Sequence, residues 1–288
     1  MQVKVENLSY NYGSKKLSVK ALDNVSLDIL EGDFFGIIGQ TGSGKSTFVQ
    51  HLNGLIKIQK ESGKIFVGNY DLSAKDCDFK GLRAKVGMVF QYPEYQLFAE
   101  TVFEDVAFGL KNFEPNLDSK NVEERVKNAI SLVGLNYEKV KDKSPFELSG
   151  GQKRRVAIAG VIVSKPEVLV LDEPVAGLDP TGKREFVALL KRLHNDFVKT
   201  IIIVSHDMNL VCENCNKVAV FKKGKILKTG QPKEIFADEE MLKDCGLELS
   251  STAYLTKVLK EKGIEIDSDL TIDGFIDVYL QQRGGKSL

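Results

Sequence analysis

A glycine-rich stretch with one lysine and two adjacent hydroxyls is the part of this sequence best suited to chemistry. It runs Gly39-Gln40-Thr41-Gly42-Ser43-Gly44-Lys45-Ser46-Thr47. Glycines let a loop curl so that successive N–H groups point at one anion, and the positive end of a following helix adds to the attraction. Lys45 can then reach the β- and γ-phosphates, and the Ser46 hydroxyl can ligate Mg²⁺. The stretch predicts binding of a nucleoside triphosphate, with these residues as its contacts.

Two consecutive carboxylates follow an apolar run further along the chain. Val168-Leu169-Val170-Leu171 precedes Asp172 and Glu173. In an open parallel sheet, ligands bind at the carboxyl ends of the strands, where such a pair would lie. We expect Asp172 to hold Mg²⁺, directly or through water, and Glu173 to orient and polarise the water that attacks the γ-phosphate. Two acids after a strand usually mark only a solvated loop, but the phosphate loop elsewhere in the chain favours the catalytic role.

A second candidate phosphate site is the stretch Leu148-Ser149-Gly150-Gly151-Gln152. Ser149 stands at a predicted helix start, where its hydroxyl and the exposed N–H groups can bind a phosphate. One nucleotide does not obviously need two such helix starts. Both are used if two copies face each other and each γ-phosphate lies between the loop of one and the Ser149 helix of the other. Taken alone, the stretch would be interpreted as a surface turn before the basic run Lys153-Arg154-Arg155.

The order of the elements around these motifs indicates an α/β core with a helical insertion. Strands are predicted at 3–8, 25–29, 34–38, 63–68, 86–90, 168–171, 200–204, 217–221 and 225–228. Helical spacing dominates from about 101 to 163 and returns at 182–194, whereas 168–171 and 201–204 are apolar throughout, as is typical of central parallel strands. We predict one nucleotide-binding domain over residues 1–240, with a helical subdomain at about 95–163, and a C-terminal helical extension over 241–288.

Composition argues against several functional classes. The 40 basic and 40 acidic residues give no net charge, so there is no overall basic field to attract nucleic acid, and we expect no nucleic-acid partner. No apolar run approaches the roughly 20 residues of a membrane-spanning helix, and the N-terminus does not resemble a signal peptide. We therefore expect a soluble protein that reaches any membrane through partners. Cys212 and Cys215 lack a second pair or a nearby histidine to complete a zinc site, so we interpret the cysteines as ordinary thiols.

Together these motifs resemble those of the ATP-binding-cassette (ABC) ATPases. Residues 39–47 resemble the Walker A loop, 148–152 the signature and 168–173 the Walker B strand, and the resemblance spans about residues 3–236 with every motif in order. It implies a P-loop fold with a mixed sheet core, a helical signature subdomain and ATP and Mg²⁺ as ligands.

The same resemblance implies roles for four further residues. Gln91 resembles the Q-loop glutamine, which in the family joins the Mg²⁺ shell and faces the membrane partner. Asp179 lies in a stretch similar to the D-loop, which crosses the dimer, and His206 resembles the switch histidine that contacts the γ-phosphate. Tyr12 stands where the family has an aromatic residue stacked on adenine, with Tyr10 as a nearby alternative.

One part of the chain is similar to a narrower group. Residues 90–98 and 104–109 resemble the ATPase subunits of energy-coupling-factor (ECF) transporters, which import vitamins and, in related systems, cobalt or nickel. The resemblance, closest to the A-prime type of subunit, implies a heterodimer with a second ABC ATPase, a transmembrane coupling subunit docked beside the Q-loop, and a substrate-binding membrane subunit. It also implies a peripheral location at the cytoplasmic face of the cell membrane.

Two questions stay open at this point. The second cassette could be an identical or a different chain. The alternative function is that of a soluble mechanical or DNA-handling ATPase with the same cassette. Such chains usually interrupt the cassette with a long coiled coil, and no such segment lies between Thr47 and Leu148.

Overall fold

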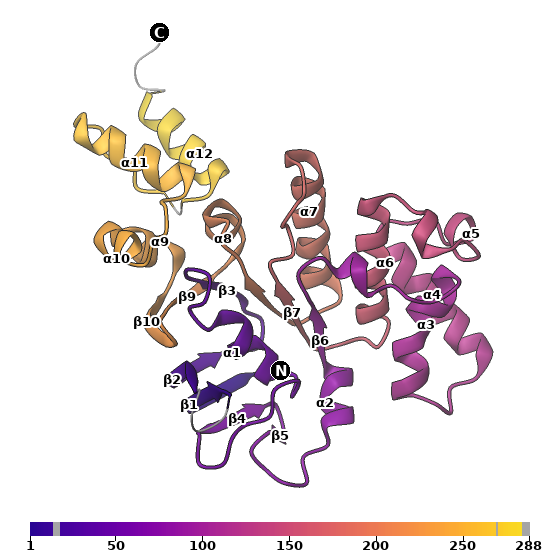
Figure 1. The fold of residues 1–288 in the computed structure, drawn as a ribbon. Coiled ribbons are helices and arrows are strands. Elements are labelled where there is room, and N and C mark those ends of the chain that lie inside the picture. The colour runs from indigo at the N-terminus through magenta and orange to yellow at the C-terminus, as the bar shows by residue number, and fades with distance from the viewer. Residues whose placement is uncertain (14–17, 269, 284–288) are drawn as a thin grey trace.

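The strands that end at the predicted site belong to one six-stranded sheet. The computed structural model describes residues 1–13, 18–268 and 270–283, and its ribbon is drawn in Figure 1. The sheet order is β10-β9-β3-β8-β7-β6. Its strands are β3 (Phe34–Ile38), β6 (Val86–Val89), β7 (Val168–Asp172), β8 (Thr200–Val204), β9 (Lys217–Lys222) and β10 (Lys225–Gly230). All neighbours pair in parallel except β10, which is antiparallel to β9, so the sheet is mixed as predicted.

The two central strands are buried on both faces, as their uninterrupted apolar sequences predict. Every residue of β7 and β8 is buried. Leu169 and Leu171 of β7 pack into one core together with the helices that lie between residues 102 and 196. Val168 and Val170 pack into the second core, which includes Phe48 of α1 (Lys45–Leu52) and residues of a smaller sheet. The sheet is therefore the layer that separates two cores.

The smaller sheet is antiparallel and has the order β2-β1-β4-β5. Its strands are β1 (Val3–Tyr12), β2 (Val19–Ile29), β4 (Lys64–Val67) and β5 (Tyr70–Asp71), and α2 (Phe79–Lys85) follows. The first two strands run beyond the predicted ranges 3–8 and 25–29, because Tyr12 still pairs with Val19. This longer hairpin carries Tyr12 to the mouth of the site.

The helical region predicted between about residues 101 and 163 is confirmed. It contains α3 (Val102–Phe113), α4 (Ser119–Leu132), α5 (Tyr137–Val140), η2 (Pro145–Glu147) and α6 (Gly150–Ile162), and a 3₁₀ turn, η1 (Pro93–Gln96), precedes it. Figure 1 shows these helices grouped beyond the β6 edge of the sheet, away from α1. Next along the chain come α7 (Pro180–Asp196) and α8 (Met208–Asn214), each directly before the next strand of the sheet.

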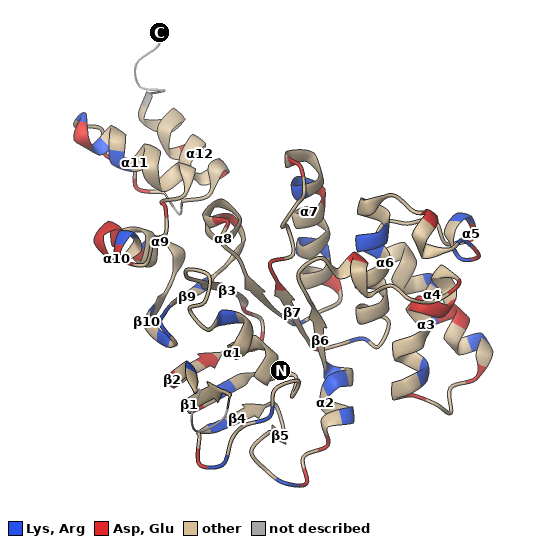
Figure 2. Cartoon of the chain, viewed as in Figure 1, with Lys and Arg blue, Asp and Glu red and all other residues tan. Residues whose placement is uncertain are grey.

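The C-terminal helices stand at the opposite end of the picture from α3–α5. They are α9 (Pro232–Phe236), α10 (Glu239–Asp244), α11 (Ser251–Glu261) and α12 (Ile272–Arg283). Leu242, Cys245 and Leu247 nevertheless pack into the same core as α8. Figure 2 shows acidic and basic residues interspersed on α10 and α11. Among the residues that the structure describes, no helix combines the length and the apolar character needed to cross a bilayer.

Truncating a buried side chain of β8 tests the central layer. Ile203 is fully buried among the helices, so Ile203→Ala should lower the free energy of unfolding by about 2–5 kcal/mol through lost burial and a residual cavity. Urea denaturation measures the effect. Leu227→Ala, on the half-exposed edge strand β10, is the control and should change it by about 0.5 kcal/mol or less. An equal loss of unfolding free energy in the two variants would contradict the burial of β8 at the centre of the sheet.

Candidate functional site

The phosphate loop joins β3 to α1 and needs glycine at two close approaches. Gly44, at the start of α1, has φ +104°, and a Cβ there would lie 2.5 Å from the backbone oxygen of Ala21. Gly39 has φ +150°, and a Cβ there would lie 2.3 Å from the backbone oxygen of Phe221. A side chain at either position would therefore push the loop away from its neighbouring strands. The loop is strand, turn and helix in the order that the sequence predicts.

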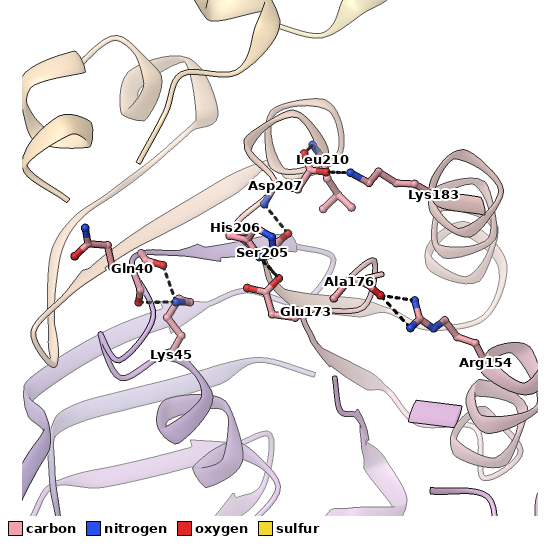
Figure 3. A network of polar contacts seen from close by, with 11 residues as sticks. Gln40, Lys45, Arg154, Glu173, Ala176, Lys183, Ser205, His206, Asp207 and Leu210 are labelled. Carbon is pink, nitrogen blue, oxygen red and sulfur yellow. Dashed lines mark hydrogen bonds and ion pairs between the residues drawn. The ribbon is translucent and has the colours of Figure 1, made fainter. Parts of the chain in front are cut away.

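Lys45 lies folded against its own loop. The residue is 7% exposed, and its Nζ donates hydrogen bonds to the backbone oxygens of Gly39 at 2.6 Å and Gln40 at 2.9 Å (Figure 3). Burial lowers the pKa of Lys45, although the nearby carboxylates of Glu173 and Asp172 oppose that change. The ammonium group is thus a buried positive charge at the start of a helix, where phosphate binds readily.

Glu173 and His206 meet at the carboxyl edge of the sheet. Each follows one of the two central strands, and the Nδ1 of His206 lies 2.7 Å from Oε2 of Glu173 (Figure 3). The Glu173 side chain is 15% exposed, whereas that of His206 is 71% exposed. Burial raises the pKa of Glu173, and His206 opposes that shift. A carboxylate placed this way can accept a proton from a water on the open side.

Asp172 is the last residue of β7 and is almost completely buried. Burial raises its pKa, and a hydrogen bond with the Ser46 side chain and the charge of Lys45 oppose the rise. Its Oδ1 has no hydrogen-bond partner within the described part of the chain. An unpaired buried carboxylate oxygen is costly, and a divalent cation would satisfy it. With Ser46 beside it, Asp172 therefore fits a Mg²⁺ ion.

One pocket of about 510 Å³ gathers most of the predicted residues. Its lining comes from the hairpin β1–β2, the phosphate loop, and the ends of β6, β7 and β8. The predicted residues in it are Tyr12, Thr41, Gly42, Gly44, Lys45, Ser46, Thr47, Gln91, Asp172, Glu173 and His206. Of the two aromatic candidates, Tyr12 lines the pocket and is 43% exposed. Tyr10 instead packs edge-on against Tyr12 and His51.

The signature residues lie elsewhere and make only local contacts. Ser149 caps α6, where its Oγ accepts from the Gln152 N–H at 3.4 Å and its own N–H donates to the Gln152 side chain at 3.1 Å. Asp179 caps α7 by accepting from the Gly182 N–H at 2.7 Å. Neither they nor Gly150 and Gly151 line the pocket among the described residues. Within one chain, the predicted site is therefore brought together only in part.

Two groups of pocket residues were not predicted from the sequence. Val19, Lys20 and Ala21, on the strand that pairs with the end of β1, line the pocket beside Tyr12. Their place depends on the irregular register of the β1–β2 hairpin, which no local pattern reveals. Beside this pocket, a second one of about 610 Å³ brings Gln40 next to residues 246–249, so the chain after α10 approaches the phosphate loop.

Comparison with known proteins identifies the family of this chain. The ABC transporter family profile matches residues 22–176. The energy-coupling factor transporter ATP-binding protein EcfA2 of Clostridium tetani is 49% identical over 271 residues, which is 94% of this chain and 93% of that protein. Its namesake in Clostridioides difficile is 48% identical over the full length of both chains. This chain belongs to the ECF transporter ATP-binding proteins of the ABC transporter family.

Solved structures show the same fold. The cbiO1 protein of Clostridium perfringens, described as part of the ABC transporter complex cbiONQ, has a TM-score of 0.72 and 41% identity, covering 88% of this chain and 98% of that one. The dimeric ATP-binding cassette MJ0796 bound to ADP and Pi has a TM-score of 0.70 and 29% identity, covering 80% and 98%. As a member of the family, this ECF-type ABC ATPase binds ATP and hydrolyses it to power transport.

Removing the buried ammonium group tests the phosphate loop. Lys45→Ala should weaken ATP binding by about 1.5–3 kcal/mol, or roughly 10- to 150-fold in Kd, because a charge-assisted contact to the phosphates is lost. Isothermal titration with ATP measures the change. Lys60→Ala, at a lysine whose side chain is 93% exposed, is the control and should bind ATP normally. Unchanged affinity in Lys45→Ala would remove the loop from the binding site.

Proposed function

We propose that this ATPase works as one half of a pair of cassettes that drives import of a vitamin or metal ion through a transmembrane partner. The observation that carries the proposal is the separation within one chain of two helix starts suited to phosphate. The phosphate loop opens into the pocket, while Ser149 lies at the start of α6 outside it. A second cassette facing the first would bring its own Ser149 and Asp179 to this pocket. The dimeric MJ0796 cassette bound to ADP and Pi supports that arrangement.

In this proposal the site residues have defined tasks. Ser46, Asp172 and Gln91 would hold Mg²⁺, which would neutralise charge on the phosphate oxygens. Glu173 orients and deprotonates the attacking water, and His206 holds the Glu173 carboxylate on the open side of the pocket. Tyr12 stacks on the adenine from the end of β1. The remaining loop residues, 39–47, bind the phosphates.

Exposed aromatic side chains beside Gln91 support docking of a membrane subunit. Tyr95 is 84% exposed, Phe98 60%, Phe108 51% and Tyr92 38%. The rings of Phe98 and Phe108 contact edge to face at 4.8 Å between centroids. Asp105 holds the end of the segment by accepting from the N–H groups of Phe98 and Ala99 at 2.9 and 3.0 Å. We define residues 92–98 as the docking segment, because a fixed apolar surface of this kind suits a protein partner.

The relatives suggest the rest of the assembly. The names of the EcfA2 proteins and of the cbiONQ complex lead us to propose a second, different ATPase subunit, a transmembrane coupling subunit and a substrate-binding membrane subunit. The chain would then be peripheral at the cytoplasmic face of the membrane. We also propose that the chain divides into two parts. Residues 1–240 would form the cassette, with a helical subdomain at about 95–163, and residues 241–288 would form the extension.

Removing the carboxylate of Glu173 tests the catalytic assignment. Glu173→Gln should preserve ATP binding and abolish turnover, since an amide cannot take the proton, and should therefore trap a nucleotide-bound pair of cassettes. Phosphate release and size-exclusion chromatography with ATP measure the two effects in the purified complex. Glu261→Gln, an exposed residue at the end of α11, is the control. Unaltered hydrolysis in Glu173→Gln would refute the role.

Placing a charge on the docking segment tests the membrane partner. Tyr95→Glu should reduce co-purification of an integral membrane subunit by about ten-fold or more, because the buried interface would then contain an unpaired charge. The ATPase activity of the cassettes alone should be retained. Tyr254→Glu, at a tyrosine on α11 that is 58% exposed, is the matched control and should keep the partner. Normal assembly of Tyr95→Glu would exclude this segment as the docking site, and a chain that retains no membrane subunit at all would favour a soluble ATPase.

A further inference from the structure

Arg154 joins three parts of the molecule through one buried guanidinium group. It belongs to α6, and its side chain is 4% exposed. Nε and Nη2 donate to the two carboxylate oxygens of Glu94 at 3.1 and 3.0 Å. Nη1 donates to the backbone oxygens of Pro174 and Ala176, and Nη2 also reaches Ala176, all at 3.1 Å. Each of its five N–H donors is thus used on a loop outside its own helix.

The backbone oxygens that Arg154 binds belong to the turn that carries Glu173. Pro174 follows Glu173 directly, and the Ala176 N–H donates to the Glu173 backbone oxygen at 3.2 Å. Glu173 itself has φ +50°, a conformation that costs a residue with a side chain about 1–3 kcal/mol. Figure 3 shows Arg154 reaching from α6 to Ala176 on this turn. The backbone of Glu173 is therefore fixed by β7 on one side and by Arg154 on the other.

The carboxylate that Arg154 binds belongs to the docking segment. Glu94 lies in η1 between the exposed rings of Tyr92 and Tyr95, yet its own side chain is only 18% exposed. A two-bond pair of arginine and carboxylate fixes the relative orientation of both groups. A displacement of η1 would therefore move Arg154, and with it the turn after Glu173. Since Ser149 caps the same helix, the displacement would also reach the signature end of α6.

We propose that Arg154 is a positioning residue that places Glu173 for hydrolysis and transmits the position of the docking segment to it. The first half rests only on ATP hydrolysis by this family. The second half rests on the proposed docking of a transmembrane subunit at residues 92–98. The two halves can be tested separately, because hydrolysis by the cassettes and its stimulation by a membrane subunit are separate measurements.

The first experiment replaces Arg154 by lysine and measures ATP hydrolysis by the purified full-length cassettes without a membrane subunit. An ammonium group keeps the charge but cannot bind Glu94 with two bonds and the turn at the same time. Arg154→Lys should lower kcat about ten-fold or more and leave the KM for ATP within about two-fold, because misplacing a catalytic group affects the reaction rather than binding. Arg125→Lys is the matched control. Arg125 donates to the Glu114 carboxylate at 2.7 Å and the Val163 backbone oxygen at 2.9 Å, away from the turn, so kcat should be retained.

A second variant keeps the test decisive if Arg154→Lys does not fold. Glu94→Gln removes one charge and leaves the bonds from Arg154 to Pro174 and Ala176 available, so it should lower kcat less than Arg154→Lys does, with the KM for ATP unchanged. In the double variant the two losses should not multiply, because both act through one pair. A kcat of Glu94→Gln equal to that of the wild-type chain would overturn the positioning role without any need for Arg154→Lys. Where Arg154→Lys folds, multiplicative losses, or a kcat equal to that of Arg125→Lys, would overturn it as well.

The last experiment compares ATPase stimulation upon assembly with the transmembrane subunit. The wild-type chain should be stimulated, and Arg154→Lys should assemble normally but lose most of the stimulation. Equal fold-stimulation in both would overturn the transmission of docking through Arg154. If the wild-type chain binds no membrane subunit, the proposed docking fails and transmission falls with it, while the kcat and KM measurements still decide whether Arg154 positions Glu173.

Discussion

The burial of three charged side chains at one edge of a parallel sheet is the constraint on which the rest of the structure depends. Lys45, Asp172 and Glu173 are 7%, 7% and 15% exposed. Taking charges out of water costs several kcal/mol each unless opposite charges and hydrogen bonds lie close. The carboxyl edge of β3, β7 and β8 meets this need, because distant segments of the chain end there side by side. The opposing pKa shifts of the lysine and the two acids reflect the same balance between burial and attraction.

The sequence predicted the parts of the site that are determined locally. An apolar run followed by glycines predicted β3 and the phosphate loop, and an apolar run followed by acids predicted β7 and the position of Asp172. Strand order could not be predicted in the same way, because it depends on contacts between distant segments. Phe34, for example, pairs with Ile201, and its neighbour Phe35 also pairs with Lys217. The extra length of the β1–β2 hairpin, which brings Tyr12 and not Tyr10 to the pocket, could not be predicted for the same reason.

The burial of a charged residue was a second feature that the sequence pattern did not predict. The basic run Lys153-Arg154-Arg155 has the composition of a solvated helix face, yet the structure buries Arg154 almost completely. Its acceptors come from Glu94 and from backbone oxygens after Glu173, and neither source is near it in sequence. A run of like charges predicts exposure only while no acceptors are available in the fold. Distance along the chain therefore limited the prediction more than the chemistry of the residues did.

Two strained residues connect the nucleotide pocket to the docking segment. Tyr92 and Glu173 both have left-handed backbone, with φ +55° and +50°, and each directly follows a residue that lines the pocket. Such a strained conformation persists only where several surrounding contacts hold the backbone in place. Arg154 supplies part of that determination at both places, through Glu94 near Tyr92 and through the oxygens of Pro174 and Ala176 after Glu173. Because the same buried group binds both strained turns, we expect the two turns to move together, so that a displacement at the surface alters the position of the Glu173 carboxylate.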